Sequence, residues 1–342
     1  MIGDALRRLW SVPFVAVALL SGGGAQRAVA QSIPRAHLLI VTGVSGEPRF
    51  ADQFHKLAMS LRSTAATRFG IPDSLITYLA ESTDPDSRAI SGRSSREGII
   101  QAVTRIAARA AVGDQVLILL LGHGVSDGTI SRFNVPGADI TDADFASLLG
   151  QLSRQVVALV NATSASGDYV KSLSGKNRVV ITATKSGFER NETLFGTHFV
   201  AAYAGEGADA DKDGRVSLLE AFTYARREVQ REYEGSNRLQ TEHAMLDDDG
   251  DGTGRADPGD RGPDGIVARS FFLQPAAGVS ASADPRAAAL IAKQTRLQSQ
   301  IDSLRLVKSS MPEAAYQKAL EDLLLELAET ANALRALGVR KP

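Results

Sequence analysis

The 342-residue chain contains no cysteine. Disulfide bridges, thiolate metal sites and thiol nucleophiles are therefore excluded, whatever fold the chain adopts. An excess of basic residues is also missing, because the formal net charge is -1 and the isoelectric point is near 6.5. The sequence thus gives no reason to expect nucleic acid or an anionic membrane surface as a partner.

Residues 1–30 have the three parts of a secretory signal peptide. Two arginines form the charged start, the apolar run Leu9–Leu20 follows, and Ala28–Ala30 offers small residues to a signal peptidase. The apolar run of about twelve residues is shorter than the ~20 needed to cross a bilayer. We therefore expect cleavage before Gln31 and a periplasmic or secreted protein that is not integral to a membrane. The alternative is an uncleaved amphipathic N-terminus on a cytoplasmic protein.

Short aliphatic runs alternate with helix-period segments from His37 to about Gly187. That alternation is typical of a mostly parallel sheet covered by helices, and it predicts an α/β domain over residues 31–274. The run Gln115–Leu121 is apolar on both faces, so we expect it to be a central strand. The predicted strands are His37–Thr42, Leu75–Leu79, Gln115–Leu121, Val156–Val160 and Val179–Thr184.

Apolar residues at helical spacing predict helices between and after these strands, with a closing strand at Ile266–Leu273. Residues 275–285 are mostly small, as is typical of a linker. In residues 286–342, leucines recur every seven positions before Pro312, and apolar residues recur at three- and four-residue intervals after it, which predicts a helical hairpin or coiled coil. The members of the two stripes are Leu290, Leu297, Ile301, Leu304, Tyr316, Leu320, Leu323, Leu327, Leu334 and Leu337. Whether this tail docks on the main domain, self-associates or binds another protein stays open. The expected helices of the α/β domain are Phe54–Ala65, Ser94–Ala111, Leu194–Ala204 and Leu218–Tyr233.

The segment most informative about chemistry is Leu119–Gly124, where His123 lies between two glycines at the end of the expected central strand. Ligands and catalytic groups collect at the carboxyl edge of a parallel sheet. The next strand runs into Asn161–Gly167, a turn rich in hydroxyl side chains. We therefore expect His123 to meet a hydroxyl in one crevice, where the imidazole serves as general base or acid. The alternative is a strand-end histidine satisfied by a neighbouring carbonyl.

The pair His123-Gly124 is followed about forty residues later by the tetrapeptide Ser164–Gly167. This pattern resembles the legumain and caspase-like peptidases, in which a strand-end His-Gly is followed by Cys-x-Ser-Gly. Phe133–Phe145 and Ile181–Thr184 are also similar to bacterial members, and the likeness covers about residues 36–272. The resemblance implies a three-layer α/β sandwich and a peptide or protein ligand.

By that resemblance, His123 takes the place of the catalytic histidine and Ser164 that of the nucleophile. Gly124 takes the place of the residue whose backbone N–H joins the oxyanion hole. An ungapped match to motifs of the Asp-Ala-Cys type puts Thr163 at the nucleophile instead, but the spacing to the downstream Ser166 favours Ser164. No third side chain stands out that would orient His123 as an aspartate does in a serine triad.

Serine in place of cysteine changes the chemistry of such a site. A thiol, with a usual pKa of about 8.5, is partly ionised beside an imidazole, whereas a hydroxyl must lose its proton during attack to a base within hydrogen-bond reach. We therefore expect a catalytically degenerate pseudopeptidase that serves as a binding or scaffold module. The alternative is an active hydrolase that uses Ser164 as nucleophile and His123 as base.

Residues 209–220 fit the twelve-residue EF-hand loop at each ligand position. Aspartates occupy positions one, three and five, a glycine occupies the sharp turn, and a glutamate closes the loop. The motif predicts Ca²⁺ as a stabilising cofactor; the alternative is a solvated acidic turn that caps the next helix. The expected ligands are Asp209, Asp211, Asp213, the carbonyl of Arg215, Ser217 and Glu220.

A second acidic tract, Asp247–Gly265, has little apolar content and is expected to be ordered by ions or to remain mobile. It begins with the spacing of a calcium loop, but Pro258 stands at the twelfth position. Either an ion binds there with the help of Asp257 or Glu242, or the tract is a flexible acidic loop.

Overall fold

The computed structural model describes most of the chain beyond the predicted signal peptide. Residues 1–30, and the predicted linker up to residue 284, lie outside the described residues. In the part of the chain that is described, no helix combines the length and the apolar character needed to cross a membrane. The described ranges are 34–205, 207–259, 263–274, 285–306, 308 and 311–337.

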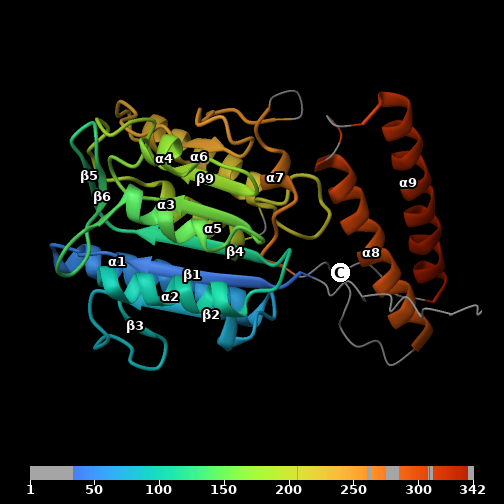
Figure 1. Ribbon diagram of the computed structural model, residues 1–342, viewed down its shortest axis with the longest axis horizontal. Coiled ribbons are helices and arrows are strands. Elements are labelled where there is room, and N and C mark those ends of the chain that lie inside the picture. The colour runs from blue at the N-terminus through green and yellow to red at the C-terminus, as the bar shows by residue number, and fades with distance from the viewer. Residues whose placement is uncertain are drawn as a thin grey trace, which may run out of the picture. The chain divides into compact units, whose positions relative to one another are not determined.

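The central sheet has seven strands: β1 (Ala36–Thr42), β2 (Ile76–Ala80), β3 (Gly92–Arg93), β4 (Gln115–Leu121), β8 (Val156–Asn161), β9 (Arg178–Thr182) and β10 (Met245–Asp247). Their order across the sheet is β10-β9-β8-β4-β1-β2-β3, as Figure 1 lets the reader follow. Every neighbouring pair is parallel except β9 and β10 at one edge. The mostly parallel sheet predicted from the sequence is therefore confirmed.

Helices cover both faces of the sheet, which makes three layers (Figure 1). Side chains alternate along β4, so that Leu117 and Leu119 belong to one buried cluster while Ile118 and Leu120 belong to the other. Both sets are fully buried, as expected for a strand covered on both faces. The first cluster includes α1 (Pro48–Thr67), α5 (Phe195–Ala204) and α6 (Leu218–Gly235), and the second α2 (Arg96–Arg109), α3 (Asp142–Gly150) and α4 (Tyr169–Leu173).

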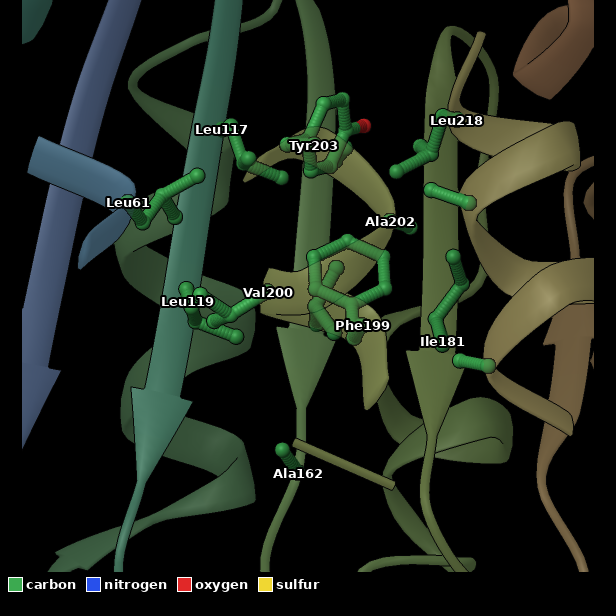
Figure 2. Close-up of a cluster of buried hydrophobic side chains, with 14 of the residues drawn as sticks. Leu61, Leu117, Leu119, Ala162, Ile181, Phe199, Val200, Ala202, Tyr203 and Leu218 are labelled. Atoms are coloured by element: carbon green, nitrogen blue, oxygen red, sulfur yellow. The ribbon is translucent and has the colours of Figure 1, made fainter. Parts of the chain in front are cut away.

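Helix α5 is held against the sheet by large apolar side chains. Figure 2 shows Phe199 and Val200 of this helix close to Leu119 of β4 and Ile181 of β9. Burying a side chain such as Phe199 contributes about 2 kcal/mol. This packing fixes the start of α5 at the carboxyl edge of the sheet, where the residues of chemical interest also lie.

A small antiparallel sheet follows His123 directly and was not predicted. It consists of β5 (Gly124–Ser126), β6 (Ser131–Phe133) and β7 (Ile140–Thr141). Strands of two or three residues are too short to show a period-two pattern in the sequence. The small sheet makes β5 the first segment to leave the carboxyl end of β4.

The predicted closing strand at Ile266–Leu273 is wrong. Residues Ile266–Arg269 form a single helical turn, α7, and Phe272 makes only an isolated bridge with Ser217. The carboxylate of Asp248 accepts the backbone N–H groups of Gly265 and Ala268, both at 2.8 Å. An acceptor at the first turn stabilises a helix, and it outweighs the strand preference of this aliphatic run.

The tail forms the predicted helical hairpin from α8 (Pro285–Leu306) and α9 (Glu313–Ala336). Tyr316 and Leu334 of the predicted stripe are buried, and Thr330 fills a position of the same stripe that the sequence did not single out. The Lys293 ammonium lies 2.8 Å from the Glu326 carboxylate across the pair. Association of this tail with another chain stays a prediction.

At the amino edge of the sheet, a buried hydrogen bond joins β1 to the start of β4. His37 Nε2 lies 3.0 Å from Asp114 Oδ2, and both side chains are buried. The same carboxylate accepts the backbone N–H groups of Arg35 and Ala111, each at 2.9 Å. The Arg35 guanidinium also donates to it at 3.2 Å, so one carboxylate accepts four donors from three residues.

Replacing Asp114 with alanine is expected to lower the free energy of unfolding by about 3 kcal/mol, because buried donors lose their acceptor. Urea unfolding measures the change. The control is Asp73→Ala, which removes an exposed ion pair with Arg62 at 3.1 Å and should cost less than about 1 kcal/mol. Equal losses in the two variants would contradict the structural role given to Asp114.

Candidate functional site

The carboxyl ends of β4 and β8 bring His123 and Ser164 to one cavity. The strands pair in parallel with Leu120 opposite Asn161, so both chains leave the sheet at the same level. His123 and Ser164 line a cavity of about 20 Å³ between α1 and the start of α5. A space of that size holds roughly one water molecule. The expected meeting of imidazole and hydroxyl at one crevice is what the structure shows.

The ring of His123 is held on three sides. Its centroid lies 4.8 Å from that of Phe50 and 5.5 Å from that of Phe54, both in edge-to-face geometry. Its Nε2 lies 3.3 Å from the backbone oxygen of Ser45. A carbonyl only accepts hydrogen bonds, so this contact assigns the proton to Nε2 and leaves Nδ1 as the acceptor in the neutral ring. The group that orients His123 is a main-chain oxygen. A main-chain atom leaves no signature in the sequence, so no orienting residue could be recognised there.

The hydroxyl of Ser164 is bonded to the backbone rather than to the imidazole. Its Oγ donates to the carbonyl oxygen of Gly124 at 3.1 Å and accepts the Gly124 N–H at 3.4 Å. The residue is only 6% exposed. Among the described residues, no hydrogen bond joins Ser164 to His123. The Gly124 N–H is therefore directed at the hydroxyl itself.

Only glycine fits at position 124. A Cβ placed there would lie 2.7 Å from the carbonyl oxygen of Ser164 and 2.7 Å from Thr163 Oγ1. Both contacts are too short for any side chain, and one of them is to backbone that cannot move away cheaply. The close approach of β5 to the turn after β8 thus depends on this glycine.

The other hydroxyls of the turn are structural. Thr163 Oγ1 is buried and donates to Asn161 Oδ1 at 2.7 Å. Ser166 Oγ lies 3.2 Å from Thr184 Oγ1 and is also buried. Of the two residues considered for the nucleophile position, Ser164 is the one that lines the cavity.

The residue after Ser164 has an unusual backbone. Ala165 has a φ of 52°, a left-handed conformation that costs of order 1 kcal/mol for a residue with a Cβ. Its N–H donates to the carbonyl oxygen of Glu189 at 2.7 Å. The Glu189 carboxylate in turn accepts the N–H groups of Lys185 at 2.9 Å and His243 at 3.1 Å. These bonds hold the sharp turn that carries Ser164.

The EF-hand-like loop brings its three aspartates together. Ligand atoms of Asp209, Asp211 and Asp213 all lie within 4.8 Å of one another. Burial raises the pKa of Asp211, and the neighbouring carboxylates raise it further. Gly214 has a φ of 86°, as the sharp turn at this position of the motif requires. A bound cation would relieve the repulsion among these carboxylates.

The remaining expected ligands partly serve other partners. Ser217 caps α6, and Glu220 accepts its N–H and its hydroxyl, each at 2.8 Å. The second oxygen of Glu220 accepts the N–H of Ala210 at 2.8 Å, so the glutamate does reach back over the loop. The Arg215 guanidinium lies 3.0 Å from an oxygen of Asp213. The donor set fits Ca²⁺, provided that Asp213 and Glu220 exchange these bonds for the ion.

The described part of the second acidic tract brings together a group of carboxylates that could hold a cation, so ion binding there stays a prediction. Asp247 and Asp249 lie beside Asp264, and not beside Asp257 or Glu242. Asp257 is 84% exposed and pairs with Arg226. The Arg255 guanidinium bonds Asp264 and lies 2.9 Å from Asp251 Oδ2. Arg255 therefore offsets part of the negative charge of the tract.

Glu242 accepts hydrogen bonds at the start of a helix. Its carboxylate accepts the N–H of Leu194 at 2.8 Å and that of Phe195 at 3.1 Å, at the start of α5. Tyr233 also donates its hydroxyl to this carboxylate at 3.3 Å. Burial raises the pKa of Glu242 to about 7 despite these donors. The start of α5, which lines the cavity, therefore depends on an ionisable group.

Comparisons with known proteins give distant structural likenesses only. No protein-family model matches the chain, and no curated protein matches it. A structural-genomics protein of Geobacter sulfurreducens is 13% identical with a TM-score of 0.39, over 63% of this chain and 93% of its own. The Drosophila initiator caspase Dronc is 14% identical with a TM-score of 0.42, over 70% of this chain and 85% of its own. Neither likeness is close enough to assign a family.

Replacing Glu242 with glutamine is expected to flatten the dependence of stability on pH. The folded protein binds the proton of Glu242 more tightly than the unfolded chain does, so the contribution is fully present below about pH 4.5 and is lost as pH rises through about 7. The stability difference between wild type and Glu242→Gln should fall by about 3 kcal/mol over that range. Unfolding curves at several pH values measure it, and parallel pH profiles for the two proteins would contradict the assignment.

Proposed function

We propose that this chain is an exported protein of caspase- or legumain-like fold whose cleft binds peptide or protein segments without cleaving them. One observation carries the proposal: the Ser164 hydroxyl is bonded to both main-chain groups of Gly124 and makes no bond to His123. The parallel strands that deliver His123 and Ser164 to one cavity support the fold family. Export is supported by the signal-peptide pattern of residues 1–30.

The chemistry of the site favours binding over hydrolysis. A serine nucleophile needs a base that accepts its proton during attack. The Ser164 hydroxyl instead donates its hydrogen bond to the Gly124 carbonyl, which cannot act as that base. The developing oxyanion needs a free N–H, and the N–H of Gly124 is directed at Ser164.

Two exposed apolar side chains, on chain segments next to cavity-lining residues, support a peptide ligand. Val125 of β5 is 45% exposed, and Phe188 of the loop after β9 is 77% exposed. The two segments are joined by Arg190, whose Nη2 donates to the carbonyl oxygen of Ser126 at 3.2 Å. Exposed aromatic and aliphatic side chains near a cleft are typical of a binding rim.

An active hydrolase is the second candidate. It is favoured by the orientation of His123, whose Nδ1 is left as an acceptor by the bond from Nε2 to Ser45. A rotation of the Ser164 side chain away from Gly124 would be required before that nitrogen accepts its proton.

A peptide library incubated with wild type and with Ser164→Ala separates the two candidates. We expect both proteins to retain the same peptides with Kd values within about twofold, because the hydroxyl is used internally, and mass spectrometry should find no cleaved product. Cleavage by wild type that is lost in Ser164→Ala would establish the hydrolase. Failure of both proteins to retain any peptide would contradict the binding function.

Calcium stabilisation is the further part of the proposal. Asp209, Asp211, Asp213, the carbonyl of Arg215, Ser217 and Glu220 would hold the ion, which would supply the positive charge that the crowded carboxylates lack. The loop leads directly into α6, which packs against α5. Ordering the loop would thus stabilise the layer that forms one wall of the cavity.

Saturating calcium is expected to raise the melting temperature, because an ion that binds only the folded state stabilises it by about 2.7 kcal/mol at one hundred times its Kd. The matched variant is Asp211→Ala, which removes a ligand oxygen from a side chain that caps no helix, so it should lose the calcium response without a large change in the chelated protein. Thermal unfolding with calcium and with chelator measures both. An identical melting temperature for wild type in the two conditions would rule the site out.

A further inference from the structure

The loop that presents the Ser45 carbonyl to His123 is anchored by three successive backbone N–H groups. The N–H of Gly43 donates to the carbonyl oxygen of Leu121 at 2.8 Å, and that of Val44 donates to the carbonyl oxygen of Asn134 at 3.0 Å. The third, that of Ser45, donates to Glu81 Oε2 at 3.0 Å. Two of these anchors are main chain on both sides. Only the third depends on a side chain.

Glu81 holds Ser45 twice. Besides the backbone bond, the Ser45 hydroxyl donates to the same carboxylate oxygen at 2.8 Å. Gly46 follows with a φ of 72°. Glycine adopts this left-handed conformation freely because it has no side chain. The position of the Ser45 carbonyl is therefore set from the Glu81 side and not by the residues after it.

The four groups follow four neighbouring strands. Across the sheet, β8, β4, β1 and β2 lie in that order. Ser164, His123, Ser45 and Glu81 come soon after their respective carboxyl ends. Parallel pairing puts all four ends at one edge, so the hydroxyl, the imidazole, the carbonyl and the carboxylate form a row.

We propose that Glu81 is a positioning residue for His123, which acts through the backbone of Ser45. The N–H and the C=O of Ser45 belong to different peptide units, so the effect is on position rather than on polarisation of one amide. With the carbonyl fixed, the Nε2–H of His123 has a stationary acceptor 3.3 Å away and the ring keeps Nδ1 toward the other side. Glu81 could not be recognised in the sequence as an orienting acid, because it contacts Ser45 and not His123 itself.

This inference rests on the proposed function only in taking His123 as the imidazole of the cleft. Its test measures a signal from the His123 ring, so the result can be interpreted even if the protein binds no peptide. The full-length protein has five histidines, and a His123→Gln spectrum assigns the ring signals of His123 in ¹⁵N-labelled protein. The measured quantity is the Nε2–H resonance, which is seen only when a hydrogen bond slows its exchange with water.

Three variants define the outcome. Glu81→Ala removes the acceptor for Ser45, and the Nε2–H signal of His123 is expected to broaden beyond detection. Glu81→Gln keeps an oxygen that accepts from Ser45 and should restore the signal. The matched control is Glu47→Ala, which removes an exposed acid of the same loop that pairs with Arg49 at 2.9 Å and should leave the signal unchanged.

A sharp His123 signal in Glu81→Ala would overturn the proposal, and so would loss of the signal in Glu81→Gln. If Glu81→Ala fails to fold, Ser45→Ala gives a milder test, because it removes one of the two bonds to Glu81. An increase of about twofold or more in the exchange rate of the His123 ring proton is expected there. An unchanged rate in Ser45→Ala would equally contradict the role of Glu81.

Discussion

Parallel, in-register pairing of β8, β4, β1 and β2 is the constraint on which the rest of the structure depends. Residues separated by more than a hundred positions in the sequence lie in one row because their strands end at the same edge. The pairing is stabilised by side chains buried on both faces of β4, so that two helical layers hold the edge in place. Any slip of one strand against the next would separate Ser164, His123 and Ser45.

At that edge, hydrogen bonds to the backbone decide the chemistry. The serine hydroxyl is satisfied by Gly124, the imidazole by the Ser45 carbonyl, and Ser45 by Glu81. Each bond is modest alone, but an unsatisfied polar group in a buried site is costly, which favours these pairings. The same rule orders the acidic tract, where Asp247, Asp248 and Asp264 are buried and bonded to donors of the chain itself.

The sequence could predict what depends on periodicity and on strand ends. The apolar run of β4 and the His-Gly that follows it were sufficient to place His123 at the edge, and the hydroxyl-rich turn placed Ser164 beside it. The Ser45 carbonyl could not be predicted, because main-chain atoms have no residue signature. The helix-start role of Glu242 could not be predicted, because a carboxylate near an acidic tract looks the same in sequence whether it meets a cation or the start of a helix. The helical turn Ile266–Arg269 could not be predicted either, because an aliphatic pattern does not reveal the acceptor that Asp248 provides.

In this account the Ser164 hydroxyl is hydrogen-bonded to the backbone of Gly124 and not to the imidazole of His123. A crystal structure with a peptide bound in the cleft tests it most directly, through the distances from Ser164 Oγ to its neighbours. We expect Oγ to stay within hydrogen-bond reach of the Gly124 carbonyl oxygen, at about 3 Å. A hydroxyl turned to the ring, at about 3 Å from a nitrogen of His123, would contradict the claim and would identify a working nucleophile.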